Sequence, residues 1–404
     1  MLIDPPGFEG LAINRIYGSF GTNKADQVWP PYDLQIFAGY CKKEGHQYKI
    51  LDANNLKLSD VQIANEIKRY SPDWVIYMTC FPTFKLDAKI AKIAKKVDRK
   101  ITVACMSLSI FSVLDPKKQM EELPDLDFIP WAEPEVPLMS LINGEDPSKV
   151  KGLYYRKSGK VLFSGPAEKL KNLDELGVPV HREMPYRIYK CPMAIHLPMA
   201  VVTASRGCIN RCVHCQAGSF QRAMRYRSVE NVLKELEEIN SLGIREIKFW
   251  DCSLPSNPQF LKNLCEEMIK RKYNFTWHCN ARAEFITPSL LKVMKKSGCH
   301  TLALGCESAN NELLKRMNKN ETKEQIESAV MMIKKEKMRT LMYLTFGLEG
   351  ETKETMKETF NFVMKLRPEF VTFGIVVPAP GTPFYDYVEK KGYLFNKRLE
   401  YQDP

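Results

Sequence analysis

Short apolar runs alternate with amphipathic stretches along the second half of the chain, from residue 199 onward. The apolar runs have the length and composition of buried β-strands. They are Met199–Ala204, Glu246–Trp250, Phe275–Asn280, Thr301–Gly305, Leu341–Phe346 and Val371–Val377. The stretches between them are expected to be helices, and they cover Ser228–Leu242, Pro258–Arg271, Pro288–Lys296, Thr322–Lys337 and Glu354–Lys365.

This alternation predicts an α/β fold in which parallel strands are joined by right-handed helical crossovers. Six such units predict a partial (β/α)6 barrel. In the first helix, Leu233, Leu236 and Ile239 form the apolar stripe that would face the sheet. Ser228 and Thr322 are the expected N-caps of their helices.

The first half of the chain, residues 1–144, also alternates strands with helices. We expect a small Rossmann-like, doubly wound sheet there, whose ligand would bind outside the carboxyl ends of its strands. The pattern rests on strands at Val75–Thr79 and Ile101–Ala104, helices at Tyr32–Lys43 and Asp60–Arg69, and a turn and strand over Gly45–Asp52.

Residues 145–197 are expected to link the two domains. Within them, Tyr154–Lys157 and Lys160–Ser164 predict a hairpin, and the proline-bearing stretch Pro179–Pro198 predicts an extended connector. The second domain then covers residues 198–404, with a short C-terminal extension after the last barrel unit. The chain is therefore either a compact enzyme or a shortened one.

The composition is that of a soluble globular protein of two or three domains, with 404 residues, 44% hydrophobic and 26% charged. No apolar run approaches the roughly 18 residues that would span a membrane, and the N-terminus has no signal-peptide pattern. Twelve cysteines at irregular spacing suit a reducing compartment. We therefore expect a cytoplasmic protein.

The net charge is +11, from 59 basic and 48 acidic residues. Lys85, Lys89, Lys92 and Lys96 recur at helical spacing, which favours a solvated helix face. The alternative is a contact surface for an acidic partner, such as a protein, an anionic lipid or a reductant. No nucleic-acid partner is expected.

Candidate chemistry is concentrated in three cysteines, Cys208, Cys212 and Cys215. Cysteines can be core residues, but the Arg, Asn and His around these make a poor core segment. A structural zinc site would need a fourth ligand, and His214 lies badly for that role between two of the cysteines. Three thiolates could instead hold three irons of a [4Fe–4S] cluster and leave the fourth iron open to a small molecule. We favour this third interpretation.

The spacing of these cysteines, with three residues and then two between them, resembles the signature of the radical S-adenosylmethionine (SAM) family. In that family the amino and carboxylate groups of SAM chelate the open iron, and reductive cleavage gives a 5′-deoxyadenosyl radical. The resemblance implies that His214 stands where many members carry an aromatic residue near the adenine, and an imidazole can also stack there.

Three later segments resemble radical SAM enzymes that carry an N-terminal cobalamin-binding domain. Leu304–Ser308 resembles their G-x-E-S segment, and Pro380–Pro383 resembles their P-G-T-P segment. Phe346–Thr352 resembles their G-x-P-G-E-T segment, with Glu349 in place of the proline. Together with the cysteines, these segments extend the resemblance over most of residues 199–392.

The resemblance implies a set of SAM-binding residues at the strand ends, where chemistry collects in barrels. Asp251 and Ser253 would contact the amino end of SAM, and Glu307 would accept hydrogen bonds from the ribose hydroxyls. Arg282 would neutralise the SAM carboxylate or orient Glu307, and the backbone near Gly347 would meet the adenine. Two further neighbours of the cluster, with a candidate catalytic role, are Tyr226 and Arg227.

The first half resembles the cobalamin-binding domain of the same enzymes, on segments such as Asp4-Pro5-Pro6 and Gly45–Asp52. The D-x-H-x-x-G motif is absent, as is usual in the radical SAM group, so the cobalt would have no histidine below it. Two segments depart from the family pattern, at Ala104–Ser107 and Trp131–Glu135. The implied cobalamin contacts are Pro6, Trp29, Asp52, Thr79, Cys80, Phe81, Ser107 and Glu133.

The resemblance implies a radical SAM C-methyltransferase that uses a [4Fe–4S] cluster, SAM and methylcobalamin. Its substrate would be an unactivated carbon, for example in a protein residue such as one of methyl-coenzyme M reductase, and its electron donor a ferredoxin or flavodoxin. The alternative is a radical SAM oxidoreductase or mutase without methyl transfer, acting on a lipid, a tetrapyrrole or a natural product. A more remote alternative is a non-catalytic iron–sulfur electron carrier.

Overall fold

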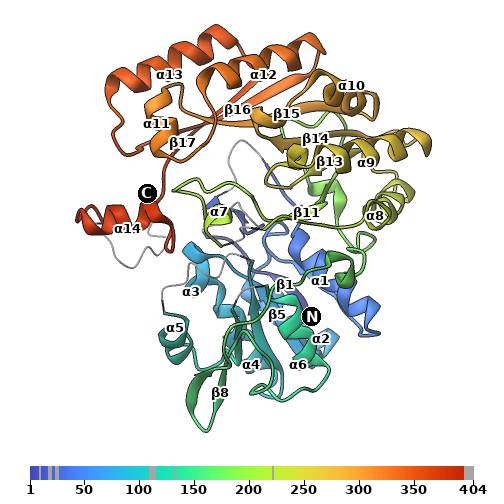
Figure 1. Ribbon diagram of the computed structural model, residues 1–404. Coiled ribbons are helices and arrows are strands. Elements are labelled where there is room, and N and C mark those ends of the chain that lie inside the picture. Colours follow the sequence, from blue (N-terminus) through green and yellow to red (C-terminus); the bar gives the residue numbers. More distant parts are fainter. Residues whose placement is uncertain are drawn as a thin grey trace. The chain divides into compact units, whose positions relative to one another are not determined.

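The computed structural model describes residues 1–8, 11–16, 21–22, 27–108, 115–131, 133–220 and 223–394 (Figure 1). The chain divides into two compact units, Met1–Ile188 and Tyr189–Tyr393. The expected C-terminal extension lies outside the described residues from residue 395 onward. No helix in the described ranges combines the length and apolar character needed to cross a membrane.

The first unit is built on a seven-stranded sheet with the strand order β4-β1-β5-β6-β7-β8-β9. The first five strands in this order are parallel, and the last two pair antiparallel. In chain order these strands are β1 (Leu2–Asp4), β4 (Ile50–Asp52), β5 (Trp74–Met78), β6 (Thr102–Met106), β7 (Phe128–Pro130), β8 (Leu153–Lys157) and β9 (Lys160–Phe163). A separate two-stranded ladder joins β2 (Ile13–Asn14) to β3 (Gly21–Thr22).

Helices cover both faces of this sheet, as expected for a doubly wound domain. Ile3, Val75 and Val103 belong to a buried cluster with Ile63 of α2 and Ile90 of α4, whereas α1 packs against β1 and α6. The helices are α1 (Tyr32–Lys43), α2 (Asp60–Tyr70), α3 (Phe84–Asp87), α4 (Lys89–Val97), α5 (Pro116–Glu122) and α6 (Glu135–Ile142). The expected Rossmann-like architecture is confirmed.

The basic residues around α4 make local ion pairs. Lys85 pairs with Glu122 at 3.3 Å, and Lys89 pairs with Asp60 at the same distance. Lys92 is exposed on α4. These contacts favour the solvated helix face over a dedicated surface for an acidic partner.

The predicted hairpin forms as β8 and β9, but the expected linker needs correction. β8 pairs with β7, so the hairpin extends the sheet of the first unit, and residues 145–188 belong to that unit. Strand pairing between separated segments leaves no trace in local periodicity, which is why the sequence suggested a connector instead.

The second unit is built on six parallel strands whose spatial order is their chain order, β10-β13-β14-β15-β16-β17. The first and last strands do not pair with each other, so the sheet is the expected open, partial barrel. The strands are β10 (Met199–Val202), β13 (Glu246–Phe249), β14 (Thr276–Ala281), β15 (Cys299–Glu307), β16 (Arg339–Phe346) and β17 (Phe370–Ile375).

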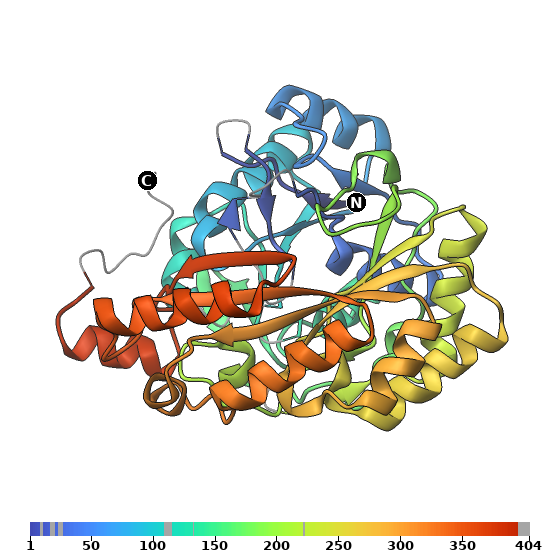
Figure 2. The same ribbon diagram turned by 90° about the horizontal axis from the view of Figure 1, so that it is seen from above.

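The crossover helices run along the outer side of this sheet (Figure 2). The predicted stripe of α8, Leu233, Leu236 and Ile239, is buried, and Ser228 and Thr322 accept backbone N–H bonds as N-caps of α8 and α12. The helices are α7 (Gln216–Phe220), α8 (Val229–Ser241), α9 (Pro258–Lys270), α10 (Pro288–Lys296), α11 (Asn311–Arg316), α12 (Lys323–Lys335), α13 (Lys353–Leu366) and α14 (Pro383–Lys390).

Candidate active site

Residues 207–215, here called the cysteine loop, leave the barrel at the C-terminal end of its first strand. β10 is followed by β11 (Ser205–Arg206), the loop, α7 and β12 (Arg225–Tyr226). β11 and β12 pair antiparallel and close this excursion at its base. The three cysteines therefore lie at the edge of the sheet where barrel chemistry is expected.

Hydrogen bonds to the backbone of the cysteine loop from distant parts of the second unit hold it in shape; the Asn318 bond comes from its side-chain amide. The Val213 N–H donates to the Met317 carbonyl at 2.9 Å, and the Asn318 amide donates to the Arg211 carbonyl at 2.9 Å. On the other side, the Phe384 N–H donates to the Val213 carbonyl at 3.0 Å.

Phe384 lies in the first turn of α14, directly after the Pro380–Pro383 segment. The Pro380–Pro383 segment therefore has a structural role, because it places the start of α14 against the cysteine loop. A second close approach is at Gly218 of α7, where an added Cβ would lie 2.7 Å from the Asn210 carbonyl oxygen. Only glycine allows the helix to pack this closely on the loop.

The three cysteines are free and half-buried, and they are the donor set of a cluster site. Burial raises the pKa of Cys212, and it raises the pKa of Cys215 to about 11. The thiols of Cys212 and Cys215 therefore stay protonated at neutral pH unless metal binding displaces the protons, as occurs at thiolate metal sites.

Several polar atoms of the cysteine loop, α7 and the segment after β13 are buried without a protein partner in the described part of the chain. Asn210 Nδ2, His214 Nδ1, Gln216 Nε2 and Ser253 Oγ are buried and have no hydrogen-bond partner among the described residues. A buried, unpaired polar atom costs roughly 1–3 kcal/mol, so four such atoms need an explanation. A polar ligand bound beside the thiols would supply it, and the residues present fit a cluster with SAM.

Five charged residues, of which Arg282, Lys319 and Glu321 are buried, form a network beside the loop, here called the Lys319 network. Its members are Arg282, Glu284, Glu307, Lys319 and Glu321. Lys319 Nζ lies 3.1 Å from Glu321 and 3.9 Å from Glu307, and Arg282 pairs with Glu284 at 2.7 Å and with Glu321 at 3.3 Å. The sequence interpretation found Arg282 and Glu307 but missed Lys319 and Glu321.

Glu307 ends β15 in a strained backbone conformation. Its φ is +65°, and the register of β15 against β16 shifts between Gly305 and Glu307. Thr345 Oγ1 donates to its carboxylate at 2.5 Å. At Gly305, an added Cβ would lie 2.9 Å from the Glu307 carboxylate and 3.1 Å from Lys319 Nζ. Backbone strain of this kind collects at ligand sites.

The remaining predicted SAM contacts differ in how many hydrogen bonds they already make within the protein. Asp251 is buried, and its carboxylate accepts bonds from the Ala204 N–H and the Ser205 hydroxyl, so it positions the chain entering the cysteine loop. Gly347 has a φ of +84°, and its N–H donates to Glu351 at 2.5 Å. Contact of these residues with SAM stays a prediction. Of the set, Ser253 is the one whose side-chain oxygen has no hydrogen-bond partner among the described residues.

Tyr226 and Arg227 make contacts that account for them structurally. The Tyr226 hydroxyl lies 3.2 Å from Ser256 Oγ. Buried Arg227 donates to Glu235, to the Thr203 carbonyl at 2.8 Å and to Asn231 at 2.7 Å, tying α8 to the end of β10. These contacts do not call for a catalytic role.

In the first unit, the predicted cobalamin contacts follow the carboxyl ends of its parallel strands. The strand order places a topological switch point between β1 and β5, where doubly wound sheets bind ligands. Pro6 follows β1, and Thr79, Cys80 and Phe81 follow β5, so four of the predicted residues flank that point. Asp52, Ser107 and Glu133 lie at or beyond the ends of β4, β6 and β7, and the Trp29 carbonyl accepts from Asn55.

The same edge carries a buried ion network that the sequence interpretation missed. Arg15 pairs with Asp4 at 3.0 Å and with Asp87 at 2.6 Å, and Thr83 donates to Asp87 at 2.6 Å. Cys80 Sγ lies 3.1 Å from Thr83 Oγ1. Burial raises the pKa of Asp4 to about 8 despite the neighbouring arginine.

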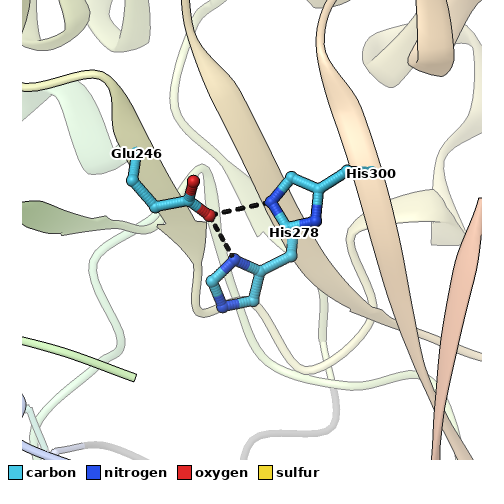
Figure 3. A group of neighbouring side chains, drawn as sticks. All are labelled: Glu246, His278 and His300. Carbon is cyan, nitrogen blue, oxygen red and sulfur yellow. Dashed lines mark hydrogen bonds and ion pairs between the residues drawn. The ribbon is translucent and has the colours of Figure 1, made fainter. Parts of the chain in front are cut away.

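A second buried group, here called the Glu246 cluster, lies toward the opposite, N-terminal end of the barrel strands. Figure 3 shows Glu246, His278 and His300, from β13, β14 and β15, turned toward one another. His278 Nδ1 lies 3.1 Å and His300 Nε2 lies 2.8 Å from the same carboxylate oxygen. One ligand atom from each lies within 4.8 Å of the others, which is compatible with a metal site.

Hydrogen bonds account for the Glu246 cluster without a metal. Arg339 lies 2.7 Å from His300 Nδ1 and can only donate, so Nε2 carries the hydrogen that Glu246 accepts. The other carboxylate oxygen of Glu246 accepts from the Ile195 and His196 N–H groups and from Thr276. A cation bound to Glu246 would have to displace the hydrogens that its neighbours donate to this carboxylate. It would also lie close to the permanent positive charge of Arg339.

The fold and the site define the class of this protein: an α/β enzyme with an open parallel barrel that carries a three-cysteine loop. The model of the radical SAM superfamily matches residues 202–363. An uncharacterized methyltransferase of Pyrococcus horikoshii is 31% identical over 396 residues, which are 96% of this chain and 82% of that protein. The chain belongs to the radical SAM superfamily.

A second relative is an anaerobic magnesium-protoporphyrin IX monomethyl ester cyclase of Cereibacter sphaeroides. It is 25% identical over 402 residues, which are 95% of this chain and 64% of that protein.

Two solved structures share the fold. The radical SAM methyltransferase TsrM from Kitasatospora setae has a TM-score of 0.78 at 17% identity, covering 96% of this chain and 75% of its own. The cobalamin-dependent SAM radical enzyme OxsB has a TM-score of 0.77 at 19% identity, covering 97% of this chain and 60% of its own. The resemblance inferred from the motifs is confirmed.

Proposed function

We propose that this chain is a cobalamin-dependent radical SAM methyltransferase that methylates an unactivated carbon. The observation that carries the proposal is the shared edge of one parallel sheet. The cysteine loop, Ser253, Arg282 and Glu307 follow successive strands, β10, β13, β14 and β15. When bound, the cluster and SAM would supply radical chemistry, and cobalamin would supply the methyl group.

The residues of this edge have separable tasks in the proposal. Cys208, Cys212 and Cys215 would hold three irons. The Glu307 carboxylate would accept hydrogen bonds from ligand hydroxyls, since Thr345 occupies only one of its oxygens. Ser253 Oγ and His214 Nδ1 would regain the partners that they lack in the described chain.

Cobalamin binding is supported by the switch point of the first unit. Thr79, Cys80 and Phe81 follow the β5 side of that point, and Pro6 follows the β1 side. We propose that the corrin lies over these strand ends. The proposed contacts are Pro6, Trp29, Asp52, Thr79, Cys80, Phe81, Ser107 and Glu133.

A second candidate is radical oxidation without methyl transfer. One relative is named a magnesium-protoporphyrin IX monomethyl ester cyclase, which favours this reading for a tetrapyrrole or similar substrate. In addition, the Ala104–Ser107 departure lies on and after β6, and its residues are buried there, so no glycine opens the backbone to a ligand. The relatives described above give no support to the narrower expectation of a protein substrate.

Anaerobic reconstitution of the full chain tests the proposal. Iron counting and optical spectra should show one [4Fe–4S] cluster and a corrin band, with an electron donor such as flavodoxin or ferredoxin supporting turnover. Mass spectrometry of cell extracts with and without the enzyme should reveal a product that is about 14 Da heavier, one methyl in place of one hydrogen. A cluster without any corrin absorption would favour the second candidate.

A further inference from the structure

We propose that Arg282 is a positioning residue that acts on the iron–sulfur cluster through Cys212. By donating a hydrogen bond to the Cys212 sulfur, it would make the cluster easier to reduce. The inference rests on the proposed function, because it requires a cluster at the cysteine loop.

The guanidinium of Arg282 is fixed on two sides by the Lys319 network. Nε donates to Glu284 at 2.7 Å, and Nη2 donates to the Lys319 carbonyl and pairs with Glu321 at 3.3 Å. The remaining nitrogen, Nη1, donates to Cys212 Sγ at 3.8 Å. The side chain of Arg282 is only 7% exposed, so this orientation is set by the protein and not by water.

These contacts also bear on the role that the family resemblance implied. Every guanidinium nitrogen of Arg282 already has a protein partner, so at most the second hydrogen of Nη1 is left to bind the carboxylate of SAM. Glu284 and Glu321 act as the supports that aim Nη1 at the sulfur, in the way that outer residues orient and tune metal ligands.

The charge balance of the network gives Arg282 its effect. Three carboxylates, from Glu284, Glu307 and Glu321, lie with two cations, from Arg282 and Lys319. Reduction adds one electron from an external donor to the cluster and neither forms nor breaks a bond in the protein. Hydrogen bonds to the sulfurs and the local net charge set the potential of such clusters. Removing Arg282 would increase the excess of negative charge beside the cluster and disfavour the added electron.

The test is an EPR-monitored redox titration of the reconstituted full chain, with dithionite as the reductant. Arg282→Gln should move the midpoint to a more negative potential. The expected size is at least a tenfold fall in the ratio of reduced to oxidised cluster at a fixed potential, equivalent to about 59 mV for one electron. Arg282→Lys keeps a charge but not the planar fork, and it should give a smaller shift in the same direction.

The matched control is Arg245→Gln. Arg245 pairs with Asn274 at 3.1 Å, lies outside the site and should leave the potential unchanged. Equal iron content with an unchanged midpoint in Arg282→Gln would overturn the inference. If that variant loads no iron, Arg282→Lys decides: a lowered potential supports the inference, and a wild-type potential overturns it. Wild-type protein that binds no cluster would instead refute the proposed function itself.

Discussion

Two buried polar groups at opposite ends of the barrel sheet differ in whether their side-chain atoms have hydrogen-bond partners. At the N-terminal end, each polar atom of Glu246, His278 and His300 has a hydrogen-bond partner. At the C-terminal end, Ser253 Oγ and His214 Nδ1 have none among the described residues. The density of polar groups is thus a poor guide to a ligand site, whereas the accounting of hydrogen bonds separates a structural cluster from a binding site.

The largest expected effect is at the C-terminal end, from Cys212→Ala. Removing one of three thiolates should abolish cluster binding and the formation of 5′-deoxyadenosine, while the fold persists because the loop is held by backbone bonds. Iron counting and product analysis measure the effect. Cys41→Ala, a buried free cysteine of α1, is the control and should keep its iron. Full deoxyadenosine formation by Cys212→Ala would remove the case for the three-cysteine site.

The next largest effect is at the N-terminal end, from Glu246→Ala. The groups that donate hydrogen bonds to Glu246 would be left buried and unpaired. Their loss of a partner should lower the free energy of unfolding by about 3–5 kcal/mol. Urea denaturation measures this change, and the iron bound per folded molecule should stay the same. Glu237→Ala, on an exposed part of α8, should change stability by no more than about 0.5 kcal/mol. A gain in stability on adding Zn²⁺ that is present in the wild type and absent in Glu246→Ala would show that the Glu246 cluster is a metal site after all.

Acid should weaken the N-terminal end in two overlapping pH windows. Burial lowers the pKa of His278 from 6.5 to about 3 in the folded protein. Between these two pH values the unfolded chain binds the proton more readily than the folded protein does, so stability falls as the pH drops through this range. Although burial opposes it, hydrogen bonds from His278, His300 and Thr276 lower the pKa of Glu246 from 4.5 to about 2.

Stability that depends on the ionised Glu246 is therefore present above about pH 4.5 and lost toward pH 2. Urea midpoints measured across this range should show the fall. Glu246→Gln should reduce the fall of the urea midpoint between about pH 4.5 and pH 2, whereas Glu237→Gln should keep the wild-type dependence on pH. Equal slopes in all three proteins would contradict the assignment.

The smallest effect compares two hydroxyls, one at each end. Without ligands, Ser253→Ala should be neutral or slightly stabilising, because the Ser253 hydroxyl has no partner to lose. Thr276→Val should cost about 1 kcal/mol, because Thr276 Oγ1 donates to Glu246 at 2.5 Å. In the loaded protein, Ser253→Ala should weaken SAM binding about tenfold, measured by equilibrium binding. A destabilised ligand-free Ser253→Ala protein would erase the contrast between the two ends.

The elements that the sequence predicted well are those with a strong local pattern. α1 begins and ends at the predicted Tyr32 and Lys43, and all six barrel strands lie within a few residues of their predicted positions. Cys208 was found from the spacing of the three cysteines, and Arg282 and Glu307 from the family resemblance; all three agree with the rule that a parallel sheet gathers its carboxyl strand ends at one edge.

The elements that the sequence did not reveal depend on tertiary contacts. Lys319 and Glu321 lie between α11 and α12, in a polar segment that has no strand-end or cap signal of its own. Their partners, Arg282 and Glu307, belong to β-strand ends elsewhere in the chain. The pairing of β8 with β7 was hidden for the same reason, since no periodicity records which strand a hairpin will join.

The hydrogen bond from Phe384 to Val213 has a consequence for synthesis of the chain. On a ribosome, the three cysteines emerge long before α14, whose backbone completes the support of their loop. A nascent chain therefore exposes metal-binding thiols well before they can be held in their final geometry. The order of translation makes insertion of iron and sulfide a late event, and thiols that are still waiting are open to oxidation or to the wrong metal.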